Sequence, residues 1–236
     1  MDVLVAGGGS PIFALHRATS TIPTVFVGVS DPVAVHLASS LSKPGGNLSG
    51  LTQMNIESSA KRLLLLQQAI PTVSRVALLR EPTNPTAPFE LSQFSSAARE
   101  LGLSYDVFDV STGNDIDQVF QKMEEQHFQA VVPFAANFMF TEKKRISALG
   151  LKHRLAVMAP SKSFVEVGTL LSYGADFPTL WLCGLLHRQD FKGRKRRHIP
   201  IQRPTKFELC FNLRTAKVLG IEISPAMLAL TDQVID

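Results

Sequence analysis

Three glycines and a serine at residues 7–10 directly follow the apolar residues 3–6. An apolar run that ends in small residues and opens a helix is typical of a buried parallel strand entering a βα loop. Backbone N–H groups at such a helix start, here those of Gly9 and Ser10, can bind a carboxylate. A tight turn that requires glycine explains the same residues equally well. A dinucleotide site is disfavoured, because Ile12 stands where the third glycine of that fingerprint belongs.

Three more polar residues follow predicted strands and are candidates to contact a small solute. Asp31 precedes Pro32, so it either caps a helix or pairs with an ammonium group. Asn84 and Asn137 stand at the corresponding strand ends of a second series of elements and could hydrogen-bond the same solute. For Asn84, a role in forming a turn is the slightly better interpretation.

Tyr173 and Asp176 form a further candidate pair, at the end of the last strand before the chain crosses from one predicted lobe to the other. A tyrosine ring can stack on a solute while a neighbouring carboxylate pairs with an amine. Asp176 precedes a Phe-Pro dipeptide, so capping of the next helix is the alternative. The candidate ligand-binding residues are therefore Gly9, Ser10, Asp31, Asn84, Asn137, Tyr173 and Asp176.

No combination of residues indicates catalysis or metal binding. Four histidines fall within or at the ends of predicted helices, away from βα loops: His16, His36, His127 and His153. A Gly-x-Ser-x-Gly motif is absent. Cys183 and Cys210 have neither CxxC spacing nor a histidine cluster beside them. We expect two free thiols, and no catalytic residue, metal or cofactor.

Alternating strands and helices must position these residues. We expect strands at 22–29, 48–54, 75–79, 105–110, 130–134 and 156–159, and helices at 11–20, 32–41, 56–69, 115–126 and 141–153, with a further helix that ends at Leu101. Such alternation predicts an α/β fold with two doubly wound parallel-sheet lobes and a cleft between them. The expected parts are a first lobe at 1–55, a second lobe at 56–176, and a third part at 177–236. This third part comprises a crossover helix, a hinge strand and C-terminal helices that return between the lobes.

Charge and hydropathy argue against two classes of protein. The net charge is +4, but segment 188–197 holds six basic residues against Asp190 alone. A nucleic-acid interface needs a distributed basic patch, with stacking aromatics for single strands, and only Phe191 interrupts this segment. We expect no nucleic-acid partner. The longest apolar stretches fall far short of the ~20 residues that a membrane span needs. From the sequence as written we also expect no signal peptide before residue 3.

Several short motifs together resemble one family. They are Asp31-Pro32, Asn84-Pro85, Pro-Gly-Gly-Asn-Leu-Ser-Gly-Leu at 44–51, Tyr-Gly-Ala-Asp at 173–176 and Pro-Thr-Lys-Phe-Glu-Leu at 204–209. Over nearly the whole chain the pattern is similar to solute-binding proteins of ABC transporters, in the bacterial family that includes tryptophan- and tyrosine-binding members.

This resemblance implies a two-lobed receptor with a type I periplasmic-binding-protein fold. Such a receptor delivers a small, amino-acid-like solute to a membrane permease and catalyses nothing. Its location would be periplasmic or otherwise extracytoplasmic, although this chain expressed as written would stay in the cytoplasm. The alternatives are a cytoplasmic ligand sensor or regulator that uses the same fold and, less favoured, a small-molecule enzyme.

The chain departs from the family pattern in two places. The family has two further βα units before the strand that opens this chain, so we expect an N-terminally truncated protein with an incomplete first lobe. Where the family has an amphipathic helix, residues 182–197 are basic. The start of this segment can be written in codons that, read one base later, encode the amphipathic helix of the family. This suggests a local frameshift entered near Trp181 and restored near His198.

Overall fold

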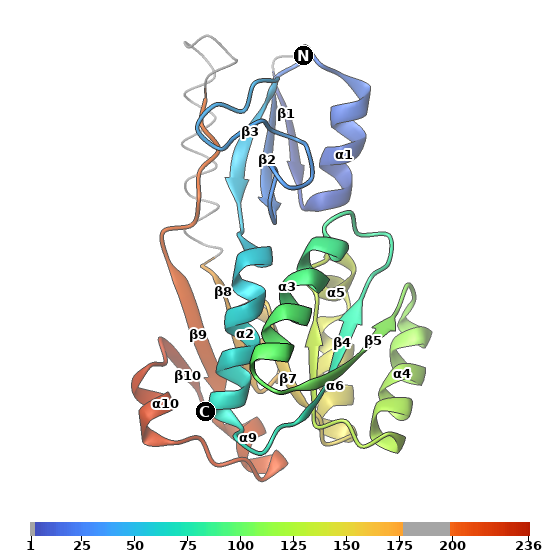
Figure 1. Ribbon diagram of the computed structural model, residues 1–236, viewed down its shortest axis with the longest axis vertical. Helices are drawn as coiled ribbons and strands as arrows, with labels where there is room; N and C mark the ends of the chain where they lie inside the picture. The colour runs from blue at the N-terminus through green and yellow to red at the C-terminus, as the bar shows by residue number, and fades with distance from the viewer. Residues whose placement is uncertain (1–2, 177–198) are drawn as a thin grey trace.

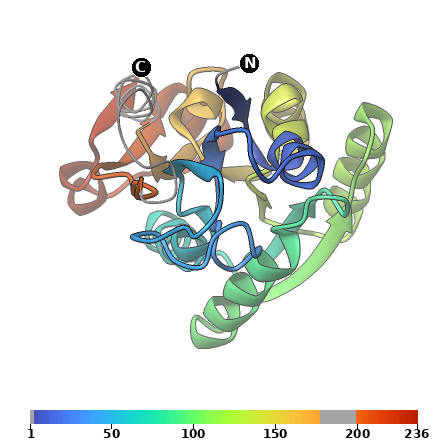
Figure 2. The same cartoon turned by 90° about the horizontal axis from the view of Figure 1, so that it is seen from above.

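The computed structural model describes residues 3–176 and 199–236, which form two lobes stacked along the long axis of the molecule (Figure 1). The first lobe contains β1 (Leu4–Gly7), α1 (Gly9–Ala18), β2 (Thr24–Val29) and β3 (Leu48–Thr52). The remaining elements belong to the second lobe. Viewed along the long axis, the first lobe lies between the C-terminal elements and the green helices of the second lobe (Figure 2).

The first lobe is built on a three-stranded parallel sheet in the order β1-β2-β3. Val25 pairs with Val5 on one side and with Ser49 on the other. Every residue of β3 is buried, as expected for a strand of a parallel sheet that is covered on both faces. The core of this lobe includes Ile12 of α1 and Phe26 of β2.

The second lobe is built on a seven-stranded sheet in the order β10-β9-β8-β7-β6-β4-β5. Its strands are β4 (Arg75–Arg80), β5 (Ser104–Asp109), β6 (Ala130–Pro133), β7 (Ala156–Ala159), β8 (Leu171–Ala175), β9 (Phe207–Asn212) and β10 (Gln233–Ile235). All neighbouring strands are parallel except β8 and β9, which run antiparallel.

Helices cover both faces of this second sheet. They are α2 (Asn55–Ala69), α3 (Ala87–Glu100), α4 (Gly113–Glu125), α5 (Asn137–Thr141), α6 (Lys143–Lys152), α7 (Lys162–Val165), α9 (Leu213–Leu219) and α10 (Pro225–Ala229). Along β4, Leu78 packs into one hydrophobic core with residues of α2 and α3, whereas Ala77 and Leu79 pack into the other with α4 and α6. Successive strand residues point to opposite faces, so the apolar sequence of β4 serves both layers.

The chain passes between the lobes from β3 into α2, and again along residues 199–206 (Figure 1). This second passage lies beside β3, where Gln202 N donates to Gly50 O at 2.8 Å and Thr52 N donates to Gln202 O at 3.0 Å. Ile201 is buried in the first-lobe core. Two adjacent backbone segments therefore form the described connection between the lobes.

The predicted α/β architecture and all six predicted strands are confirmed, with ends that shift by a few residues. The helix predicted at 32–41 is wrong: these residues form turns, and His36 has a positive φ of 58°. The short helix α5 was not predicted. β9 and β10 lie in the second-lobe sheet, so that lobe extends beyond the predicted end at residue 176. Cys183 and the suspected frameshift at 182–197 lie outside the described residues.

No helix in the described part of the chain combines the length and the apolar character that crossing a membrane requires.

Candidate functional site

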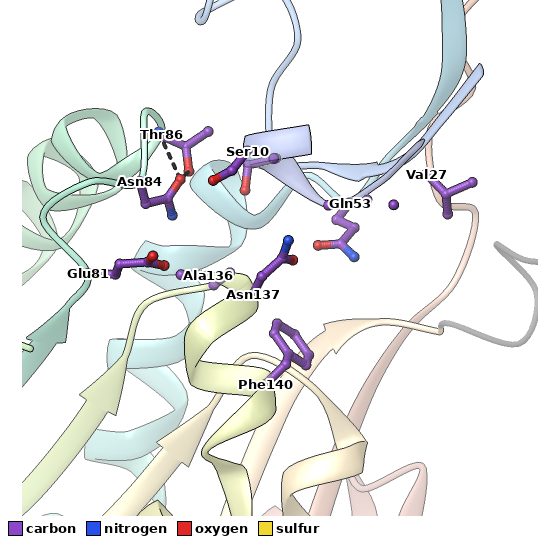
Figure 3. Close-up of a pocket in the computed structure, with 15 residues that line it drawn as sticks. Ser10, Val27, Gln53, Glu81, Asn84, Thr86, Ala136, Asn137 and Phe140 are labelled. Carbon is purple, nitrogen blue, oxygen red and sulfur yellow. Dashed lines mark hydrogen bonds between the residues drawn. The ribbon is translucent and has the colours of Figure 1, made fainter. Parts of the chain in front are cut away.

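A cavity of about 130 Å³ lies between the lobes, at the carboxyl ends of strands from both sheets (Figure 3). The first lobe and the passage after β3 contribute Gly7, Gly8, Gly9, Ser10, Val27, Gly28, Ser30 and Gln53. The second lobe contributes Glu81, Asn84, Thr86, Ala135, Ala136, Asn137 and Phe140. Ligands of open α/β sheets bind at this edge, in the crevice formed by the loops that follow the strand ends.

The start of α1 supplies backbone donors to one wall of the cavity. Gly8 is the N-cap of α1, without a side-chain cap, and the first turn of the helix contains no acidic residue. Gly8 N is engaged by Val27 O at 2.8 Å. Gly9 and Ser10 are the first helical residues, and N–H groups in a first turn have no intrahelical acceptor. This wall can therefore accept a carboxylate or another acceptor group.

The loop after β4 forms the opposite wall. Of the described residues that line the cavity, Glu81 alone carries a charge. Asn84 Oδ1 accepts hydrogen bonds from Thr86 N at 3.2 Å and from Thr86 Oγ1 at 3.0 Å, so this oxygen holds the loop that leads into α3. The Glu81 carboxylate suits a cationic group of a solute.

A buried ion pair between α2 and α3 holds the loop after β6 in place. Glu90 of α3 accepts from Ala135 N at 3.2 Å and from Arg62 Nη2 of α2 at 2.7 Å. Both side chains are fully buried. Burial raises the pKa of Glu90 and lowers that of Arg62, whereas their mutual attraction opposes both shifts. The pair thus fixes Ala135 at the edge of the cavity.

Gly8 and Asn137 bring the two lobes into direct contact. Gly8 has φ 77° and ψ −177°, a conformation that essentially only glycine adopts. A Cβ placed on Gly8 would collide with the Asn137 carboxamide. Because these residues come from different lobes, the structure is a closed arrangement in which the glycine permits the approach.

Phe140 of α5 separates this cavity from a neighbouring one of about 290 Å³. The second cavity is also lined by Ser161, Lys162, Ser163, Glu166, Ala175 and Glu208. The Phe140 ring meets the ring of Phe164 edge-on, with centroids 5.2 Å apart. A solute too large for the interlobe cavity would have to extend past Phe140.

Four of the candidate residues lie together at the interlobe cavity: Gly9, Ser10, Asn84 and Asn137. For Asn84 the turn-forming interpretation is confirmed by its bonds to Thr86, but its side chain also borders the cavity (Figure 3). Their contact with a solute remains a prediction.

The structure places the other three candidates elsewhere. Asp31 Oδ1 accepts from Val33 N and Ala34 N, so it caps a turn and borders a separate surface cavity. The Tyr173 ring stacks on Phe207 of the antiparallel neighbour β9. Asp176 follows β8, and its backbone N donates to Lys206 O at 3.1 Å. The second cavity lies near the end of β8, and neither Tyr173 nor Asp176 is among the described residues that line it.

Gln53, Glu81 and Phe140 border the cavity but were not predicted as site residues. Gln53 falls inside the strand predicted at 48–54, and Glu81 lies two residues after the end of the strand predicted at 75–79. The rule that ligands meet strand ends could have indicated these two. The position of Phe140 depends on the orientation of α5, which no pattern in the sequence indicates.

The comparison with known families matches residues 1–235 to the ABC transporter substrate binding protein family. A curated relative is the tyrosine-binding protein of Clostridioides difficile (strain R20291), 24% identical over 225 residues. The alignment covers 94% of this chain and 64% of that relative. The chain therefore spans slightly less than two thirds of the relative's length.

Two solved structures share the fold. The ABC domain from Streptococcus pneumonia in complex with L-Trp has a TM-score of 0.91 at 24% identity, over 99% of this chain and 79% of that one. A conserved domain protein from Vibrio cholerae also has a TM-score of 0.91 at 24% identity, over 99% and 78%. With the family match over residues 1–235 and this two-lobed fold, the chain belongs to the ABC transporter substrate binding protein family.

Proposed function

We propose that this protein is the receptor of an ABC transporter and captures one small, amino-acid-like solute between its lobes. The observation that carries the proposal is the interlobe cavity, whose walls come from the strand ends of both sheets and carry polar groups from each lobe. A solute held there touches both lobes at once. Such a site binds the solute most tightly in the closed form, and so shifts the population towards closure.

The chemistry of the walls favours a solute that carries both an acceptor and a cation. Backbone N–H groups at the start of α1 suit a carboxylate, and Glu81 suits an ammonium group. The volume of about 130 Å³ is similar to the ~150 Å³ of an engineered cavity that binds benzene. The site therefore suits a single small molecule, and an aromatic side chain would reach towards Phe140. The tyrosine-binding relative and the L-Trp complex support an amino acid as the solute.

Transport without catalysis is the role we infer. Of the described residues at the cavity, none is a histidine, lysine or cysteine that could activate a hydroxyl of Ser10, Ser30 or Thr86. The partner would be a membrane permease, and the working location would be extracytoplasmic, as family membership suggests. A closed surface formed by both lobes is what a permease can distinguish from the open receptor.

Calorimetric titration of this chain with each of the twenty amino acids tests the proposal. We expect one or a few of them to bind with 1:1 stoichiometry, and native mass spectrometry of protein taken directly from cells to show the same solute. Absence of binding by every amino acid would overturn the proposal. Chemical turnover of the bound solute would instead indicate an enzyme, and a co-purified sugar or nucleotide would indicate a different solute class.

A further inference from the structure

Gln53 lies at the first passage between the lobes, between β3 and α2. Its backbone N donates to Val29 O of the first lobe at 3.0 Å. Its side chain borders the interlobe cavity, yet only 7% of the residue is exposed. A polar side chain in this position is largely cut off from bulk water, so its unpaired atoms require a partner inside the cavity.

The orientation of the Gln53 carboxamide is fixed by Asn55. Asn55 Nδ2 donates to Gln53 Oε1 at 2.6 Å, in a buried contact. The described residues offer no hydrogen-bond partner to Gln53 Nε2, and this atom is not among the fully buried polar atoms. The oxygen is therefore occupied, and the N–H₂ group opens to the cavity.

Two further features keep this arrangement in place. Gly28 has a positive φ of 90°, and a Cβ at this position would lie 2.7 Å from Gln53 Nε2, so only glycine leaves room for the amide. The backbone oxygen of Asn55 accepts from Arg62 Nη2 at 2.9 Å and from Ser59 Oγ at 2.8 Å. The buried pair of Arg62 and Glu90 thus anchors the residue that orients Gln53.

We propose that Gln53 is a specificity-determining residue that donates a hydrogen bond from Nε2 to the carboxylate of the solute. Asn55 sets the orientation of its carboxamide. The Asn84 carboxamide has the same orientation, because its oxygen accepts hydrogen bonds from Thr86 and its amide nitrogen is directed into the cavity (Figure 3). The inference rests on the proposed function and names the solute group that this part of the site selects.

The test compares amino acids with the amines that lack their carboxylate. L-tyrosine and tyramine, and L-tryptophan and tryptamine, are titrated into the wild type, Gln53→Glu, Asn55→Asp and the control Gln118→Glu, whose residue is exposed on α4. Gln53→Glu keeps an oxygen for Asn55 but turns a carboxylate oxygen towards the solute. Asn55→Asp removes the donor to Gln53, so the amide can turn its oxygen into the cavity. Urea unfolding of each variant identifies any loss that comes from the fold.

We expect both site variants to bind the amino acid roughly 10- to 100-fold more weakly, as for loss of a hydrogen bond to a charged group, and the amine no more weakly than the wild type does. The Gln118 control should match the wild type. Unchanged amino-acid affinity in a folded Gln53→Glu or Asn55→Asp variant would overturn this inference alone. The inference would also be overturned if the wild type bound tyramine and tryptamine as tightly as L-tyrosine and L-tryptophan. A wild type that binds none of the four compounds would overturn this inference, whereas the titration with all twenty amino acids decides separately whether the proposed function stands.

Discussion

At Gly8 the two lobes approach each other closely beside the described cavity. Its ψ near 180° combined with a positive φ places it in a region that costs other residues of order 1–3 kcal/mol. In addition, a Cβ there would collide with Asn137. The same position therefore carries a backbone constraint and a contact between lobes.

We expect Gly8→Ala to weaken solute binding by at least about 10-fold, because the closed arrangement becomes strained while the open one is relieved of the Asn137 contact. Calorimetric titration with L-tyrosine measures the change. Gly46→Ala is the matched control, since a Cβ on Gly46 meets nothing within 4 Å and Gly46 does not line the cavity. Equal affinity for Gly8→Ala and Gly46→Ala would show that this approach does not contribute to binding.

Glu81 provides a second test at a single residue. If its carboxylate pairs with a solute ammonium group, Glu81→Gln should weaken binding by about 1.5 to 3 kcal/mol, the scale of a hydrogen bond to a charged group. Thermal unfolding of the solute-free protein should change little, because Glu81 is only partly buried. Glu222→Gln, at an exposed position, controls for the change in net charge. A comparable effect of both substitutions would argue against a direct contact.

The sequence could indicate which end of each strand carries the site, but not which side chains turn into it. Gly9, Ser10, Asn84 and Asn137 lie shortly after strand ends and do border the cavity. Tyr173 is expected at a strand end, but it lies in the middle of β8, and the antiparallel pairing of β8 with β9 places its ring on Phe207. That pairing joins segments far apart in the chain, so local patterns could not reveal it.

At the scale of elements, α2 and α3 are joined by the buried pair of Arg62 and Glu90, which also anchors the loop after β6. Breaking a buried ion pair leaves one charge without compensation, whereas replacing both partners by apolar residues removes the charge and the desolvation cost together. The energetic role of the pair can therefore be separated from its role in packing.

Arg62→Met is expected to lower the free energy of unfolding by about 3–5 kcal/mol, because Glu90 then remains buried without its cation. The double variant Arg62→Met with Glu90→Leu should recover most of this loss. Urea unfolding monitored by circular dichroism gives both values. If the double variant is no more stable than Arg62→Met, the loss comes from packing of the Arg62 side chain and not from the stranded charge.

The predicted helix at 32–41 shows why local signals fail at some elements. Asp31 before a proline is a strong start signal for a helix, and its side chain does cap Val33 N and Ala34 N. The positive φ of His36 then ends the regular winding, and the buried Leu37 and Ala38 pack into the first-lobe core from a turn. Tertiary packing decided this segment, whereas strands such as β7 were predicted with their observed bounds because apolar runs mark them directly.

For the whole molecule, the inequality of the two lobes is the feature with the clearest physical consequence. The first lobe packs a small core against three strands, whereas the second packs two larger cores on a seven-stranded sheet. Among the described strands β1 pairs with β2 alone, and Val5 on it is 62% exposed. Stability scales with buried apolar area at about 25 cal/mol per Å², so the lobes should differ in local stability.

Hydrogen exchange measures this difference directly. We expect the amides of β1 and α1 to exchange first and those of β4, β6 and β7 last, because the latter strands lie inside the larger sheet. Addition of L-tyrosine should then slow exchange most at Gly8 to Ser10 and in β2, since a solute that binds both lobes stabilises the weaker one through its contacts. Uniform protection of the amides in both lobes without solute would contradict the expected difference in local stability. Protection gained in the second lobe alone would mean that the solute does not reach the wall formed by α1.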